Sequence, residues 1–408
     1  MNQQKQVSIL ALPVIVAALG YFVDIYDLLM FSIIWKPSLT DLGVSAERLA
    51  HVGENIIGIQ MAGLLIGGII WGTMGDKKGR LSVLFGSIIL YSVANILNGF
   101  VQNETQYAIV RFIAGLGLAG ELGAGITLVS EIVPKEKRGL ATSLVAGLGL
   151  TGAVVAYFVK INFPWRTCYF IGGGLGFLLL LLRVSVFESG MFTQVKNSSV
   201  SKGDILMFFK NKVRFKKYLC AILIGLPTWY VIGVLLTFSP VFAKEFGITD
   251  PIDSGKAIMF AYAAISVADV LAGMLSQWMK SRKKAMLVFY CLTALFIILF
   301  FVTKGGGSAT NLYILAAGLG FATGFWAIFV TMGAEQFGTN LRATAATTVP
   351  NFVRGMLPLM IILCNAFRSK TDYVTGTWMA GIIIMAIAVT ALYFTKETFG
   401  KDLNYVEE

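Results

Sequence analysis

Apolar stretches of about 20 residues recur along the whole chain, and this repetition limits its possible folds more than any other feature. A helix of roughly 20 apolar residues is long enough to cross the ~30 Å hydrocarbon core of a bilayer. Hydrophobic residues make up 56% of the chain and charged residues only 13%, whereas about a quarter of the residues in soluble domains are charged. The sequence therefore predicts an all-α membrane protein that crosses the bilayer many times.

We expect twelve membrane-spanning helices in this chain. They lie at residues 9–35, 52–74, 82–101, 106–131, 140–160, 166–187, 218–243, 256–278, 285–303, 310–333, 344–366 and 373–395. No small-residue cleavage site follows the first stretch, so we expect it to stay in the membrane. The four cysteines fall in or beside four different spans, and we interpret them as packing residues rather than disulfides.

The distribution of positive charge predicts the orientation. Of the 33 Lys and Arg residues, 22 lie in the two termini and in the loops expected on the same side of the membrane. The opposite loops hold 9, and Arg111 and Arg354 lie within spans. Because cytoplasmic loops are enriched in Lys and Arg, both termini are expected in the cytoplasm. The formal charge of +11 is thereby explained by topology, and no basic patch indicates a nucleic-acid partner.

The chain divides into two halves of six spans each, separated by its longest polar connection. We expect an N-terminal six-helix bundle at 1–187, a cytoplasmic linker at 188–217, and a C-terminal six-helix bundle with a short tail at 218–408. An internal repeat supports this division: SEIVPKEKRG and AEQFGTNLRA carry the same Glu-x6-Arg spacing, displaced by 204 residues. Two parallel six-helix repeats are typical of secondary transporters.

The segment GTMGDKKGR, residues 72–80, resembles the signature between spans 2 and 3 of the major facilitator superfamily. DIYDLLMF, RFIAGLGLAGE, the two Glu-x6-Arg segments and KETFGK resemble the sugar porters and their phosphate/proton and metabolite/proton symporter relatives. The resemblance covers essentially the whole chain. It implies the major facilitator fold and transport by alternating access, without a bound cofactor other than the coupled proton.

Charged residues and glycines cluster at the expected cytoplasmic helix ends. On the simplest interpretation these charges only anchor the topology, but their repeated spacing favours a network that forms in one state and breaks in another. The resemblance implies a cytoplasmic latch of the outward-facing state. The gate residues are Gly72, Asp76, Gly79, Arg80, Glu131, Arg138, Glu335, Arg342 and Glu397.

Two carboxylic acids, Asp24 and Asp27, interrupt the first apolar span. Each costs roughly 2.5–3.5 kcal/mol at the centre of a membrane helix, so each needs a partner, a cavity or a function. Their spacing of three places them on one helix face. Counting about 1.5 Å per residue places Arg111 of span 4 at a similar depth, which predicts an Asp–Arg pair.

This pair has two interpretations: a permanent salt bridge between helices, or a proton switch in which Arg111 controls the acid as the cavity changes shape. The resemblance to proton-coupled sugar porters favours the switch and matches Asp27 and Arg111, with Asp24 as an extra acid. Glu121 either carries a proton or contacts substrate, or it only hydrogen-bonds to a neighbouring helix. Both alternatives remain open.

In the second half, Arg354 lies in span 11 between Pro350 and Pro358. Two prolines predict a bent helix whose freed carbonyls face a cavity. Arg354 is then an anion clamp for carboxylate or phosphate, unless it pairs with Asp269 of span 8. Aromatic residues are expected to shape the cavity: Tyr21, Tyr26, Trp229, Tyr230, Phe325 and Trp326.

Together these features predict a proton-coupled symporter of a small organic anion or zwitterionic metabolite, located in a bacterial inner membrane and functioning as a monomer. The alternative is a proton-driven exporter of cationic or amphipathic compounds, which the surplus of intramembrane acids supports. An enzyme is disfavoured, because the chain lacks a nucleophile with its base and a cluster of metal ligands. The single histidine, His51, is expected at the membrane interface, so proton coupling must depend on carboxylates.

Overall fold

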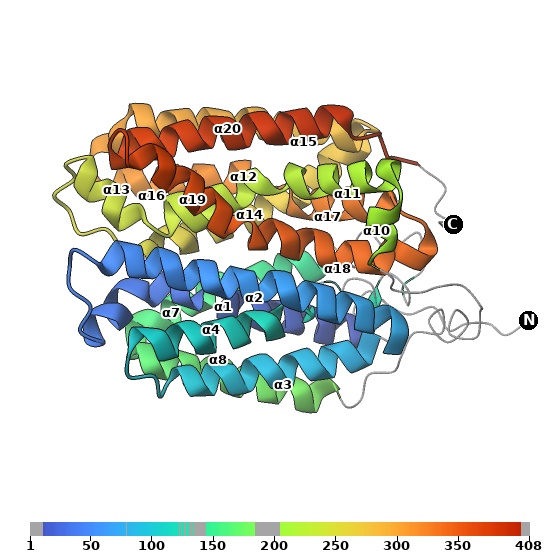
Figure 1. Ribbon diagram of the computed structural model, residues 1–408, viewed down its shortest axis with the longest axis horizontal. Helices are drawn as coiled ribbons and strands as arrows, with labels where there is room; N and C mark the ends of the chain where they lie inside the picture. The colour runs from blue at the N-terminus through green and yellow to red at the C-terminus, as the bar shows by residue number, and fades with distance from the viewer. Residues whose placement is uncertain are drawn as a thin grey trace, which may run out of the picture.

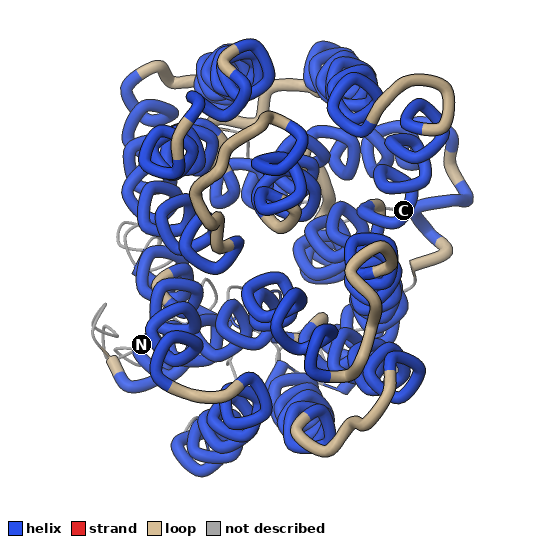
Figure 2. Tube along the Cα trace, turned by 90° about the vertical axis from the view of Figure 1, so that its left-hand side faces the viewer, coloured by secondary structure: helices blue, strands red, loops and turns tan. Residues whose placement is uncertain are grey.

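The computed structural model describes residues 11–78, 80–121, 144–183 and 205–400, together with residues 123, 125, 128, 129 and 133. Helices and their connections make up these parts of the chain, without a β-strand. In Figure 1 the helices of the first half lie below those of the second half, with their long axes roughly parallel. Figure 2 shows the same two groups end-on. We call them the N-bundle and the C-bundle.

The N-bundle contains α1 (Leu12–Asp41), α2 (Leu49–Lys78), α3 (Arg80–Asn98), α4 (Glu104–Leu118), α7 (Gly152–Asn162) and α8 (Trp165–Arg183). The C-bundle begins with α10 (Met207–Lys210), α11 (Lys212–Ile224), α12 (Leu226–Trp229), the π-helix η1 (Tyr230–Leu236), α13 (Ser239–Glu245), α14 (Ser254–Trp278) and α15 (Arg282–Val302). It continues with the 3₁₀ turn η2 (Lys304–Gly307), α16 (Ala309–Ala322), α17 (Trp326–Glu335), α18 (Thr339–Gly355), α19 (Leu357–Arg368) and α20 (Tyr373–Phe394).

Eleven stretches of the described residues are long and apolar enough to cross a membrane. The expected fourth span is represented by α4, beyond which several residues lie outside the described part, so the count of twelve stays a prediction. The bundle boundaries at 187 and 217 also stay predictions, because residues 184–204 lie outside the described part of the chain. Helix α1 begins and α20 ends at the same end of the molecule (Figure 1). We call this the cytoplasmic end, following the charge distribution, and the other the outer end.

Three transmembrane segments of the C-bundle are irregular near mid-depth. The segment α18–α19 is interrupted at Met356, between the two prolines that predict a bend there. The segment α16–α17 is interrupted at residues 323–325, and the segment α11–α12 continues into a π-helix. These two irregularities were not predicted. Interrupted helices leave backbone groups for ligands or side chains to satisfy, and such irregularities often mark functional sites.

The two bundles contact each other on both sides of mid-depth. The contacts at the outer end are the Glu54–Arg368 ion pair (2.7 Å), the Lys160–Asp253 ion pair, the Trp35 Nε1 bond to Thr237 O (3.0 Å) and the Ser254 Oγ bond to Ser32 O (3.1 Å). Toward the cytoplasmic end, Asn351 Nδ2 of α18 donates to Ala119 O, 2.7 Å away. The described residues therefore join the two bundles both at the outer end and nearer the cytoplasmic end.

Glycines permit close helix packing at equivalent places in the two bundles. A Cβ on Gly115 of α4 would lie 2.2 Å from the carbonyl oxygen of Gln60 in α2. A Cβ on Gly320 of α16 would lie 2.3 Å from the carbonyl oxygen of Ala261 in α14. Each helix pair thus depends on the absence of a side chain, as is common where membrane helices approach closely.

We expect Gly115→Ala to lower the unfolding temperature of the purified protein, because the added methyl group must push α4 away from α2 and such overpacking costs about 1–3 kcal/mol. Gly174→Ala on α8 is the matched control, since a Cβ there meets no atom within 4 Å. Alanine is also the better helix former. Equal unfolding temperatures for the two variants would contradict the close packing of α2 and α4.

Candidate functional site

Asp24 and Asp27 of α1 are both fully buried, and their four carboxylate oxygens accept no hydrogen bond from the described residues. Asp24 interacts electrostatically with Arg354 of the C-bundle. Asp27 instead faces α8, because a Cβ on Gly172 would lie 2.2 Å from its Oδ1. The spacing of three had placed the two acids on one face, but one is directed toward the bundle interface and the other into the N-bundle.

Arg111 of α4 is held by three helices. Its Nε donates to Gln60 Oε1 and its Nη1 to Asn95 Oδ1, both at 3.2 Å. Its Nη2 donates to the backbone oxygen of Asp27, 3.1 Å away. The predicted meeting of Asp27 and Arg111 therefore occurs, but through the main chain. The Asp27 carboxylate has Asn95 nearby, although no donor reaches either oxygen with hydrogen-bond geometry.

Glu121 forms an ion pair with Arg183 at the end of α8. Both side chains are 1% exposed, and Arg183 Nη1 donates to Glu121 Oε2 at 3.0 Å. Sequence reasoning had counted Arg183 among the cytoplasmic charges and missed this partner. The sequence contained one indication of this pair: Arg183 lies inside an expected span, at about the depth where Glu121 lies in another.

Arg354 lies next to the end of α18, at the interruption before α19. Its guanidinium carbon is 5.9 Å from the ring centre of Trp229 and 5.7 Å from that of Trp326. Nη1 donates to Asn351 Oδ1 at 3.3 Å, whereas Nε is buried without a partner among the described residues. The same holds for the indole nitrogen of Trp326. Buried donors of this kind suit a ligand that supplies acceptors.

Asp269 of α14 does not pair with Arg354. Its Oδ1 accepts a hydrogen bond from the backbone N–H of Ala327, 2.8 Å away, in the first turn of α17. The carboxylate therefore caps this half-helix from a neighbouring helix, where it also complements the positive end of the helix dipole. This contact fixes the start of α17 and, with it, the position of Trp326.

Tyr26 and Tyr230, both expected in the cavity, instead form equivalent contacts inside the two bundles. The Tyr26 hydroxyl donates to Cys168 O of α8 at 2.9 Å. The Tyr230 hydroxyl donates to Thr377 O of α20 at 2.8 Å. The two tyrosines are 204 residues apart, which is the displacement of the sequence repeat. Each hydroxyl thus joins the first transmembrane segment of its bundle to the last.

Half of the expected cytoplasmic gate falls outside the described residues, namely Gly79, Glu131, Arg138 and the side chains of Asp76 and Arg80. Gly72 lies at the contact of α2 with α18, where its Cβ would be 3.2 Å from Thr348 Cγ2. In the C-bundle, Arg282 Nη2 is 3.4 Å from Glu335 Oε1. Arg342 Nη2 donates to Phe337 O at 3.2 Å.

Glu397 follows α20 and anchors the segment after it. Its carboxylate accepts hydrogen bonds from the Ser281 hydroxyl and from the backbone N–H groups of Arg282, Lys283 and Phe399. Partial burial alone would raise the pKa of Glu397, but these hydrogen bonds outweigh it and lower the pKa to about 2. The ionised carboxylate therefore ties the C-terminal segment to the α14–α15 connection.

Comparison with known proteins places this architecture in one family. The sequence pattern of the Major Facilitator Superfamily matches residues 17–361. Among solved structures, a proton:xylose symporter bound to 6-bromo-6-deoxy-D-glucose superposes with a TM-score of 0.74 at 18% sequence identity, covering 96% of this chain and 97% of that one. This likeness shows that the fold is shared.

Curated relatives match the chain over most of its length. The niacin transporter NiaP of Acinetobacter baylyi is 25% identical, with 96% of this chain and 95% of the relative covered. The benzoate transport protein of the same organism is also 25% identical, with 81% of this chain and 78% of the relative covered. Both are similar transporters of small molecules.

We expect Glu121→Gln to destabilise the protein by about 3–5 kcal/mol, because it leaves the buried Arg183 charge without its partner. The double variant Glu121→Leu/Arg183→Leu is expected to recover most of this loss, since neither charge is then buried alone. Denaturant unfolding in mild detergent measures both. A single variant as stable as the wild type would contradict a structural ion pair.

The stability that Glu397 contributes should depend on pH. Because folding depresses its pKa to about 2 from an ordinary value of 4.5, the contribution is fully present above about pH 4.5 and is lost as the pH falls toward 2. We therefore expect the difference in unfolding temperature between the wild type and Glu397→Gln to be constant from pH 7 to 5 and to shrink below pH 4.5. A difference that grows on acidification would contradict the docking contact.

Proposed function

This chain belongs to the Major Facilitator Superfamily, and from that premise we propose that it is a proton-coupled symporter of a small organic anion. It is a transporter and not an enzyme. The niacin and benzoate transporters that resemble it match 96% and 81% of its length. The eleven apolar stretches among its described residues suit an integral, multi-pass protein of the bacterial inner membrane. Two bundles enclose one central site, so a single copy suffices for alternating access.

The observation that carries the proposal is the environment of Arg354. This guanidinium is 1% exposed and lies at the bundle interface, where Asn351 is its one side-chain hydrogen-bond acceptor among the described residues. Asp24 interacts with it electrostatically, but no carboxylate of the described residues bonds to it, and a substrate carboxylate offers the planar, bidentate partner that a guanidinium prefers. We therefore assign Arg354 as the anion clamp of the transport site.

The aromatic groups around Arg354 narrow the substrate class to an aromatic carboxylate. Trp229 and Trp326 lie on irregular segments of two helices and both contact the guanidinium. Their faces suit a flat aromatic ring whose carboxylate reaches Arg354. Relatives named for niacin and benzoate, which are small aromatic carboxylic acids, support this class.

Proton coupling is assigned to Asp24 and Asp27. An ionised carboxylate without hydrogen-bond donors is costly in a closed membrane protein, whereas the protonated acid is tolerated. Both acids are buried without a hydrogen-bond donor among the described residues. Asp24 is the nearer of the two to the substrate clamp, because it interacts electrostatically with Arg354. Asp27 is in contact with Arg111 and the interior of the N-bundle.

The same two acids support a second candidate, a proton-driven exporter of cationic compounds. Two buried carboxylates without partners offer a cation the negative charge that it needs. Arg354 opposes this alternative, because it places a positive charge at the bundle interface, beside Asp24. The sign of the ligand charge therefore separates the two functions.

We expect nicotinate and benzoate to raise the unfolding temperature of the purified protein, because a ligand at 100 times its dissociation constant adds about 2.7 kcal/mol of stability. Arg354→Ala should abolish this increase by removing the clamp. Arg48→Ala is the control, since Arg48 pairs with Glu104 on the exposed surface. Asp27→Asn should remove the difference between measurements at pH 5.5 and 7.5.

Stabilisation by organic amines alone, unchanged in Arg354→Ala, would overturn the symporter in favour of the exporter. Stabilisation by carboxylates that persists in Arg354→Ala would contradict the clamp. The amine and carboxylate series should therefore be measured on the same preparations.

A further inference from the structure

We propose that a chain of three hydroxyl groups in the N-bundle, on Ser38, Tyr107 and Tyr169, is the outer part of the path by which protons reach Asp27. This inference rests on the proton-coupled function proposed above and names the residues that deliver the proton. The three residues belong to α1, α4 and α8, and each is fully buried.

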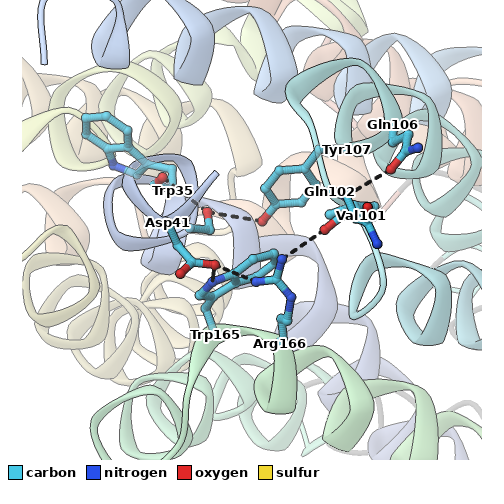
Figure 3. Close-up of polar contacts among 9 residues, drawn as sticks. Trp35, Asp41, Val101, Gln102, Gln106, Tyr107, Trp165 and Arg166 are labelled. Atoms are coloured by element: carbon cyan, nitrogen blue, oxygen red, sulfur yellow. Dashed lines mark hydrogen bonds and ion pairs between the residues drawn. The ribbon is translucent and has the colours of Figure 1, made fainter. Parts of the chain in front are cut away.

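The hydroxyl groups form a continuous series of hydrogen bonds. The hydroxyl oxygens of Tyr169 and Tyr107 are 2.6 Å apart. The Tyr107 hydroxyl donates to Ser38 Oγ at 3.3 Å, and Ser38 Oγ donates to Trp35 O at 3.1 Å. Figure 3 shows the outer part of this series, from Tyr107 to α1. Linked hydroxyls of this kind can pass a proton, because each both donates and accepts.

The inner end of the series lies close to Asp27. Tyr169 and Gly172 are three residues apart on α8, about 4.5 Å along the helix axis, and Gly172 contacts the Asp27 carboxylate. The Arg111 guanidinium lies 5.3 Å from the centre of the Tyr169 ring and donates to Asp27 O. Arg111 thus adjoins both Tyr169 and Asp27, and a bridging water between the Tyr169 hydroxyl and the Asp27 carboxylate completes the proposed path.

The outer end of the series reaches a polar cluster at the surface. Asp41 lies one helical turn beyond Ser38 on α1, and its side chain is 54% exposed. It accepts hydrogen bonds from Trp165 Nε1 at 3.1 Å and Arg166 Nη1 at 2.6 Å. The Trp165 ring also stacks on Tyr107, with ring centres 5.7 Å apart (Figure 3). This cluster covers the outer end of the hydroxyl series.

Other buried polar groups are located in the same part of the N-bundle. Asn95 Nδ2 and both amide atoms of Asn98 are buried without a partner on α3. Such groups are costly in an apolar interior unless the protein uses them. The titratable groups that interact with Asp27 are Asp24 and Tyr26 of α1, Tyr91 of α3 and Arg111 of α4. Of these, Arg111 adjoins the hydroxyl series through Tyr169.

The hydrogen bonds can be oriented in one direction along the series. Trp35 O can only accept, so with Ser38 donating to it, Tyr107 donates to Ser38 and Tyr169 donates to Tyr107. The hydrogens are then directed from Tyr169 toward Trp35. Before delivery the hydroxyls must donate inward. A proton arriving at Ser38 then displaces the Ser38 hydrogen to Tyr107, the Tyr107 hydrogen to Tyr169, and the Tyr169 hydrogen to the bridging water, which passes one of its own protons to Asp27.

This transfer leaves each hydroxyl neutral and converts the Asp27 carboxylate to the acid. It also leaves the Tyr107 and Tyr169 hydrogens directed toward Ser38. Rotation of the three hydroxyls resets the series for the next cycle.

The test compares net uptake with exchange in proteoliposomes, using radiolabelled nicotinate and benzoate as probes. Net uptake driven by a pH gradient requires a new proton in each cycle, whereas exchange of internal for external substrate requires none. We expect Tyr107→Phe and Tyr169→Phe, which keep the rings, to slow net uptake by about tenfold, because each removes a positioned proton carrier. Exchange should remain close to the wild-type rate in both variants.

Tyr290→Phe is the matched control, because the buried Tyr290 hydroxyl donates to Ile224 O in the C-bundle, far from the proposed path. If wild-type uptake responds to the pH gradient and the two variants behave like Tyr290→Phe, the path is wrong while the symporter stands. If exchange falls as much as net uptake, the hydroxyls are structural and the path is also wrong. A wild type whose uptake ignores the pH gradient overturns the symporter, and the path with it.

Discussion

Every polar group within the hydrocarbon region must find its partner inside the protein, and the structure depends on this constraint throughout. No water in the bilayer core replaces a missing hydrogen bond. The N-bundle meets the requirement for Arg111 with three acceptors from three helices, and for Glu121 with the opposite charge of Arg183. These contacts connect helices that apolar side chains alone would hold with little specificity, because lipid is as apolar as they are.

Against this background, the groups that lack partners identify the functional region. Asp24, Asp27 and the Nε of Arg354 are buried and unsatisfied among the described residues. The first lies at the bundle interface, the second faces the interior of the N-bundle, and the third lies at the interruption between α18 and α19. Such groups are costly at mid-depth, and the proposed function satisfies them with a proton at the acids and a substrate at the guanidinium.

The internal repeat is preserved in packing but not in chemistry. Tyr26 and Tyr230 join the first and last helices of their bundles through the same type of hydrogen bond, and glycines bring equivalent helix pairs together. In contrast, the N-bundle carries Asp27, Arg111, Glu121 and Arg183, while the C-bundle carries the irregular segments and the aromatic residues around Arg354. The two halves therefore share a scaffold but differ in the polar and aromatic groups that they place near mid-depth.

The sequence by itself determined the helical membrane fold, the two-fold repeat, the bend in the eleventh expected span, and the acids and Arg residues that needed an explanation. These properties follow from composition, periodicity and the cost of burying charge, which are local or additive along the chain. Only the tertiary structure decided which partner each charge has: Arg111 bonds to the Asp27 main chain, Glu121 to Arg183, and Asp269 to the start of α17. It also turned Tyr26 and Tyr230 away from the expected cavity and aligned Ser38, Tyr107 and Tyr169. Hydrogen bonds act over about 3 Å and depend on direction, so helix depth alone cannot choose between neighbours that a rotation of the helix exchanges.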